Sequence, residues 1–119
     1  MNKKDLIKRT KEFAHRCVKL AVSLPRTYLG NHIKGQLIRC SSSVAANYRA
    51  ACLGISNAAF VSKLSIVIEE ADETEFWLDF IIVEQLKPKH LIEPLKNEAH
   101  ELSSIFIASR KTIQMKNLD

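Results

Sequence analysis

Apolar residues recur along the first half of the chain at alternating steps of four and three, the spacing of one face of an α-helix. The pattern predicts helices over residues 4–24 and 31–53. Pro25 ends the first, because proline lacks an amide hydrogen and disfavours helix at the preceding residue. The two stripes are Leu6, Thr10, Phe13, Cys17, Leu20 and Leu24, then Ile33, Leu37, Cys40, Val44, Tyr48 and Ala51.

The second half repeats this spacing and predicts helices over residues 56–86 and 91–115. Pro88 ends the third helix, and Pro94 fits the first turn of the fourth. Trp77 and Phe80 lie beside the main stripe of the third helix, which indicates that this helix is buried on two sides. The stripes are Phe60, Leu64, Val67, Ala71, Thr74, Leu78 and Ile81, then Leu95, Ala99, Leu102, Phe106, Ser109 and Ile113.

Four amphipathic helices with short connections predict an all-α fold, an antiparallel up-down-up-down four-helix bundle in one domain over residues 1–119. Composition agrees, because 3 glycines and 3 prolines are too few for the many turns of a β-sandwich. No apolar run approaches the roughly 18 residues that cross a bilayer. The basic N-terminus has no apolar segment of a secretory signal. We therefore expect a cytoplasmic protein with no membrane contact.

Charge divides the chain unevenly. Residues 1–53 hold 11 Lys and Arg and 2 acids, net +9, whereas residues 54–119 hold 7 and 11, net −4, which together give the total of +5. Either the two halves attract each other, within a chain or between subunits, or the basic half meets a polyanion. The candidate nucleic-acid-binding residues are Lys4, Lys8, Lys11, Arg16, Lys19, Arg26, Lys34 and Arg49.

Residue patterns of catalysis and metal binding are weak. A di-iron bundle needs two Glu-x-x-His pairs, and only Glu12–His15 fits that spacing. Three cysteines without a C-x-x-C pair predict neither a zinc site nor a disulfide framework. The serines at 41–43 are more typical of close helix packing than of a nucleophile. We expect no catalytic residue, no metal and no cofactor.

Polar side chains beside the apolar stripes of the second and third helices form a further candidate site. If these two edges meet, Arg39 pairs with Glu70 or Glu73, and the pair specifies register and assembly more than it adds stability. Trp77 and Phe80 would supply an apolar interface nearby. The candidate network and interface residues are Gln36, Arg39, Asn47, Glu70, Glu73, Trp77 and Phe80.

Two segments resemble a known bacterial family. Residues 36–51, QLIRCSSSVAANYRAA, and residues 60–78, FVSKLSIVIEEADETEFWL, are similar to the 23S rRNA intervening-sequence proteins, in the branch with a Glu-Thr-x-x-Trp-Leu motif. Ala50 departs from the family, which usually has Glu there, so a salt bridge made by that Glu is absent. Ser41 and Ala45 stand where glycine is common. The first and fourth helices match in pattern only.

The resemblance implies a four-helix bundle that assembles into a homo-oligomeric ring, with a pentamer as the expected form, and no enzymatic activity. Members are encoded within inserts in 23S rRNA genes, and relatives are accessory proteins of diversity-generating retroelements. Two hypotheses follow. The first is a ring that binds RNA or DNA nonspecifically through its basic face. The second is a protein–protein adaptor or scaffold, for example accessory to a reverse transcriptase, with no direct nucleic-acid role.

Overall fold

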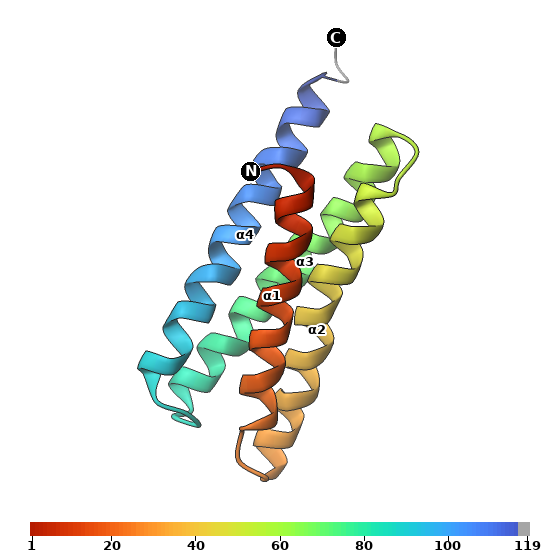
Figure 1. Cartoon of the computed structure of the whole chain (residues 1–119). Helices are drawn as coiled ribbons and strands as arrows, with labels where there is room; N and C mark the ends of the chain where they lie inside the picture. The colour runs from red at the N-terminus through yellow and green to blue at the C-terminus, as the bar shows by residue number, and fades with distance from the viewer. Residues whose placement is uncertain (117–119) are drawn as a thin grey trace.

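The computed structural model describes residues 1–116, which form four helices in antiparallel order (Figure 1). They are α1 (Lys3–Val22), α2 (Tyr28–Cys52), α3 (Asn57–Val83) and α4 (Lys89–Lys116). The bundle measures 52 × 21 × 20 Å, and no strand occurs in the described residues. The expected all-α up-down-up-down four-helix bundle is therefore confirmed.

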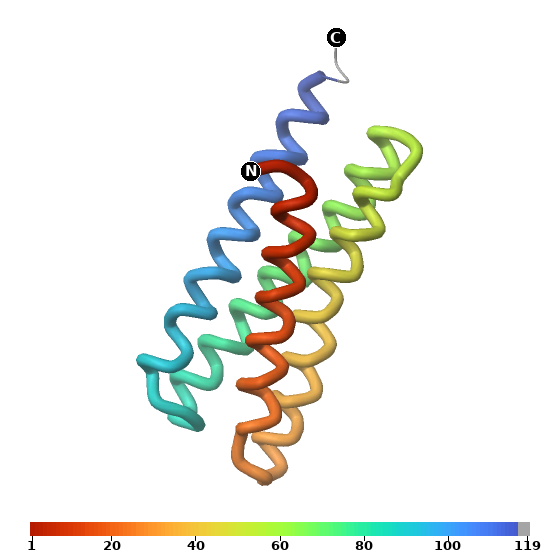
Figure 2. Tube along the Cα trace, viewed as in Figure 1, coloured from red at the N-terminus to blue at the C-terminus, as the bar shows by residue number. Residues whose placement is uncertain are grey.

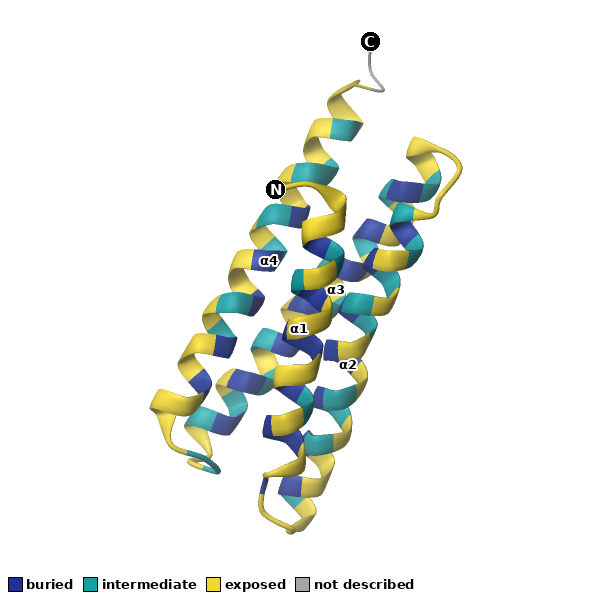
Figure 3. Ribbon diagram, in the orientation of Figure 1, coloured by how far each residue is buried: buried dark blue, intermediate teal, exposed yellow. Residues whose placement is uncertain are grey.

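The core runs along the bundle axis, between the inward faces of the helices (Figure 3). Phe13, Leu37, Leu64 and Phe106 are fully buried, one from each helix. The ring of Tyr48 packs on that of Phe106 with centroids 4.9 Å apart. The stripes of four-and-three spacing thus coincide with the buried positions except at Ser109 and Ile113 of α4, which are half-buried. Removing this apolar surface from water is the main force that holds the helices together.

Side-chain caps fix the beginnings of the first three helices. Asn2 forms a capping box with Asp5, and Ser56 accepts a hydrogen bond from the Ala59 amide. Thr27 caps α2 in the same way, so α2 begins at Tyr28, three residues before the expected start. Gly30 is therefore helical, and a Cβ there would lie 1.9 Å from the Pro25 carbonyl oxygen. The tight α1–α2 turn requires glycine at this position.

The α3–α4 connection also differs from the expected boundaries. α3 ends at Val83, and Gln85 adopts a left-handed backbone with φ of 55° that stops the helix three residues early. α4 begins at Lys89, which makes Pro94 its sixth residue, so the expectation that Pro94 lies in the first turn is wrong. The trace in Figure 2 shows that α1, the shortest helix at 20 residues, begins below the upper end of α4.

Candidate functional site

A row of lysines covers the outward face of α1. Lys4, Lys8, Lys11 and Lys19 are all exposed, and His15 lies exposed between them. Glu12, also exposed on α1, lies 4.0 Å from Lys8, a separation at which a surface pair contributes little. The row therefore keeps most of its positive charge. These four lysines and Arg49 of α2 are called the basic surface below.

A groove between α1 and α2 borders this surface, with a volume of about 540 Å³. Its apolar floor comes from both helices, and Lys11, His15 and Arg49 lie among its lining residues. α2 contains no aspartate or glutamate, so its side of the groove offers no carboxylate. The remaining lining residues are Ile7, Ala14 and Val18 of α1 and Ser42, Ala45 and Ala46 of α2. We call this hollow the α1–α2 groove.

Three of the candidate nucleic-acid residues lie beside or away from the basic surface. Lys34 is half-buried and precedes Arg49 by fifteen residues, so helical spacing places it near the α1 edge of α2. Arg16 follows Arg9 by seven residues and so shares the side of α1 that faces α4. Arg26 is exposed in the α1–α2 connection. The structure therefore does not bring all eight predicted cations together.

Arg9 is a cation of α1 that the sequence analysis did not include among its candidate residues. Its guanidinium donates to both carboxylate oxygens of Glu98 at 2.8 and 2.6 Å and lies 3.0 Å from Glu101, both on α4. The side chains of Arg9 and Glu98 are only 20% and 16% exposed. The hydrogen bond to Glu98 raises the pKa of Arg9 above its ordinary value. These three residues, the Arg9 network, join the first helix to the last.

Arg39 joins α2 to α3 in a second network, as the sequence predicted. Its Nη1 donates to Glu70 at 3.0 Å, its Nη2 donates to Glu73, and Gln36 accepts from the same guanidinium at 3.2 Å. The Arg39 side chain is 49% exposed. Asn47 does not take part, because its amide donates to Ser43 on its own helix at 2.8 Å. We call Gln36, Arg39, Glu70 and Glu73 the Arg39 network.

Glu73 is the point where this network meets an aromatic cluster. The indole nitrogen of Trp77 donates to Glu73 at 3.1 Å. Burial alone would raise the pKa of Glu73, but the hydrogen bonds from Arg39 and Trp77 outweigh it, and the pKa lies below its usual value. The carboxylate therefore stays ionised, which keeps both donors in place.

The aromatic cluster extends over the α2–α3 surface. The Trp77 ring lies 5.0 Å from Phe76, 5.6 Å from Phe80 and 5.6 Å from His32, all between ring centroids. Trp77 and Phe80 are half-buried against the core, in agreement with the expectation of a third helix buried on two sides. Phe76 is 55% exposed, and the sequence interpretation did not single it out. A signal was present, since Phe76 follows Glu69 and Asp72 on a second helical stripe.

The negative charge of the later half belongs mainly to α3. Six acids and one lysine lie within Asn57–Val83, whereas α4 holds five Lys and Arg and three Glu. Asp79 pairs with Lys96 at 2.9 Å, and Glu75 lies 3.2 Å from His100 Nδ1. The helices α1 and α2 are therefore basic and α3 is acidic, whereas the positive and negative charges of α4 nearly cancel.

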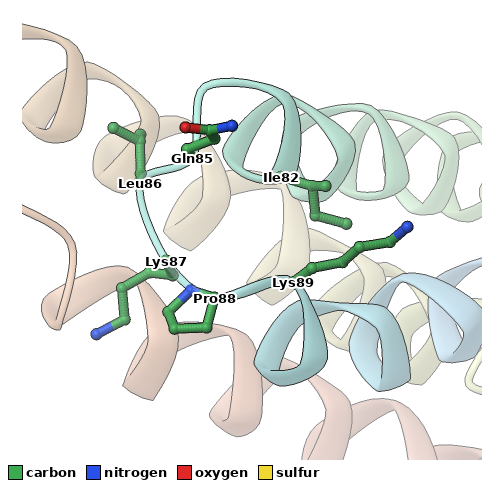
Figure 4. Close-up of a pocket in the computed structure, with 6 residues that line it drawn as sticks. All are labelled: Ile82, Gln85, Leu86, Lys87, Pro88 and Lys89. Carbon is green, nitrogen blue, oxygen red and sulfur yellow. The ribbon is translucent and has the colours of Figure 1, made fainter.

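The thiols and the hollow at the α3–α4 connection offer little chemistry. Burial raises the pKa of Cys17 to about 12 and that of Cys40 to about 11, so neither is a thiolate nucleophile at neutral pH. Figure 4 shows a hollow at the α3–α4 connection, where the side chains of Lys87 and Lys89 point apart. No group of three or more His, Cys, Asp and Glu residues within residues 1–116 is placed to hold a metal ion. No helix in the same range is long and apolar enough to span a bilayer.

Comparison with known proteins agrees with this architecture. The family model described as 23S rRNA-intervening sequence protein matches residues 2–108. A crystal structure of a protein of unknown function from the S23 ribosomal protein family, from Bacteroides thetaiotaomicron VPI-5482, is similar over 93% of this chain and 99% of its own. The two share 30% identity, with a TM-score of 0.80. No curated protein matches. The chain therefore belongs to the 23S rRNA-intervening sequence protein family.

Proposed function

We propose that this protein is a non-enzymatic, homo-oligomeric protein that binds RNA or DNA without sequence preference through its basic surface. The observation that supports this best is the unneutralised lysine row on α1 beside a helix that carries no acid. Arg9 and Arg39 are occupied by carboxylates, but Lys4, Lys11 and Lys19 have no ion-pair partner within the described residues. Lysine side chains free in solvent are the groups that neutralise phosphates.

Assembly would strengthen this binding. A ring of five chains, each with a net charge of +5, carries about +25, and its field would attract a polyanion from solution. Nonspecific binding of this kind depends on release of counterions, so the affinity should fall steeply with rising salt. The basic surface contains no Phe, Tyr or Trp, and His15 is the ring exposed among its lysines, which favours phosphate contacts over base recognition.

The test is binding of the full chain to a labelled RNA and to a DNA of the same sequence over a salt series. The log of the affinity plotted against the log of the salt concentration should have a slope of about −3 or steeper, since several lysines contact phosphates. The variant Lys4→Gln, Lys8→Gln, Lys19→Gln should reduce both affinity and slope. The matched control Lys63→Gln, Lys111→Gln, Lys116→Gln removes the same charge from exposed positions on α3 and α4. Equal loss in both variants, or no binding at about 50 mM salt, would reject the proposal.

A second candidate is a protein–protein adaptor, for example accessory to a reverse transcriptase. The exposed Phe76, with Trp77 and Phe80 beside it, favours this role, because aromatic side chains dominate the energy of many protein interfaces. Affinity purification from the native cell, with and without nuclease, separates the two. A protein captured equally in both conditions supports the adaptor, and one lost on nuclease treatment supports nucleic-acid binding.

A further inference from the structure

The outward face of α3 carries a second stripe that stays largely exposed in the bundle. It consists of exposed residues at steps of three and four, and we call it the outer stripe: Glu69, Asp72, Phe76, Asp79 and Val83. Phe76 is 55% exposed and Val83 is 69% exposed. Apolar side chains seven residues apart on one helix face, such as Phe76 and Val83, have the spacing of a helix that docks in an apolar groove.

The α1–α2 groove has the complementary character. Its floor is apolar, with Ile7 and Val18 from α1, and the side chains from α2 are small, so a helix could approach the floor closely. Its cations are Lys11 and Arg49, and the outer stripe offers Asp72 and Asp79 as their counterparts. Asp79 also pairs with Lys96 of α4 at 2.9 Å, so Asp72 supplies the stronger attraction. Apolar groups would therefore meet apolar groups and charges would meet opposite charges.

Gly35 adds an independent observation on the same side of the molecule. It is exposed, lies inside α2, and precedes the groove residue Ser42 by seven residues, two helical turns. A Cβ at Gly35 would meet no atom within 4 Å, so nothing within the described chain requires glycine there. Glycine destabilises a helix interior relative to alanine, and a site where another backbone approaches closely is a common reason for it.

We propose that the outer stripe of one copy docks in the α1–α2 groove of a second copy, with Phe76 as the central apolar contact. Figure 1 shows α1 in front of the bundle and α3 behind it, so the two surfaces lie on different faces. Contacts between different faces are head-to-tail, and they close into a ring or extend into a filament. This inference rests on the homo-oligomer of the proposed function and names its contact surfaces. Docking would cover Lys11 and Arg49 of the basic surface, whereas Lys4, Lys8 and Lys19 do not line the groove and stay available to phosphates.

The test is a charge exchange between the two surfaces, on nuclease-treated protein, with mass measured by sedimentation over a series of concentrations. One variant is Lys11→Glu, Arg49→Glu in the groove, and the other is Asp72→Lys, Asp79→Lys in the stripe. Each should be monomeric where the unmodified chain associates. An equal mixture should associate again, because each groove then meets a stripe of opposite charge. The control Lys111→Glu, Lys116→Glu repeats the first change on α4 and should associate normally.

Three outcomes overturn the proposal. They are an unmodified chain that is monomeric throughout, a single variant that associates like the unmodified chain, or a mixture that stays monomeric. All four substituted residues are exposed, so circular dichroism should show unchanged helix content. If either variant is unfolded, Phe76→Ser replaces it and should weaken association at least tenfold, and unchanged association would overturn the proposal. The variant Lys4→Gln, Lys8→Gln, Lys19→Gln should lose RNA binding but associate normally, so loss of RNA binding and loss of assembly are distinguishable.

Discussion

Arg9 and Arg39 are each bound by two glutamates, but they join different pairs of helices and differ in how far their side chains are exposed. Arg9 joins α1 to α4 with a side chain 20% exposed, whereas Arg39 joins α2 to α3 with a side chain 49% exposed. The helices they join also differ, since α2 packs closely on α3 while α1 contacts α4 less extensively. The Arg9 network therefore stabilises the sparsely packed α1–α4 contact. The Arg39 network lies at the edge of the α2–α3 contact, which is already closely packed.

The energy of an ion pair depends on its surroundings. When one member of a partly buried ion pair is removed, the other keeps its charge with neither a partner nor enough water around it. A half-exposed guanidinium can exchange its partners for water at small cost. The free energy of unfolding, measured by urea denaturation followed by circular dichroism, distinguishes the two networks.

The largest effect is expected for Arg9→Met. This variant keeps apolar contacts of the side chain but leaves Glu98 half-buried without its cation, and we expect a loss of about 3 kcal/mol. Arg16→Met is the matched control, because Arg16 is exposed on the same helix, and it should change stability by less than about 0.5 kcal/mol. Equal effects in the two variants would contradict the assigned role of the Arg9 network.

A smaller loss is expected for Arg39→Met, about 1 kcal/mol, because half of the Arg39 side chain is already in water. Glu73 would keep its hydrogen bond from Trp77, which limits the cost further. Arg49→Met on the same helix serves as the control and should be neutral within about 0.5 kcal/mol in the monomer. A loss for Arg39→Met as large as that for Arg9→Met would remove the distinction between the two networks.

Salt should separate the networks again. Raising the ionic strength to about 1 M shortens the screening length to about 3 Å, which weakens exposed charge pairs and affects buried ones much less. The cost of Arg39→Met should therefore shrink toward zero at high salt, while that of Arg9→Met should persist. The measurement is the difference in unfolding free energy between each variant and the unmodified chain at low and high salt. A parallel decline of both would indicate that Arg9 is as accessible to ions as Arg39.

The smallest effect concerns pH. The folded pKa of Glu73 lies below its ordinary value of 4.5, so its ionised form stabilises the fold fully above about pH 4.5. That contribution is lost as the pH falls through the folded pKa. Glu73→Gln should therefore lose less stability on acidification than the unmodified chain, with curves that converge at low pH. Identical slopes below pH 4.5 would show that the Arg39 network does not lower this pKa.

The sequence predicted one network and missed the other for a physical reason. Arg39 and its partners lie on consecutive helices, which pack side by side in an up-down bundle, so their edges can be matched by helical spacing. Arg9 and Glu98 are separated by 89 positions, and pairing the first helix with the last needs a register that no local pattern provides. No partner for Arg9 could therefore be named from the sequence, and Asn47 looked like a network member although it bonds within its helix.

The spacing of apolar residues predicted where the helices lie, whereas single residues set where the helices end. Thr27 and Gln85 determine where α2 begins and α3 ends, through a hydrogen bond and a left-handed backbone that spacing alone does not reveal. Phe76 was overlooked because the main stripe of α3 already explained the helix. A second stripe becomes visible only once the first is known to be buried.

The sparse α1–α4 seam has a consequence for motion. Local opening follows the least-packed boundary, and α1 is both the shortest helix and the one attached to α4 through a single ionic network within residues 1–116. Cys17 faces the interior from α1 and has no exposed surface. Cys40 and Ser41 of α2 lie against this thiol, so a reagent would modify Cys17 only when α1 separates from α2 as well as from α4. The rate of that modification would therefore measure how often the first helix leaves the bundle.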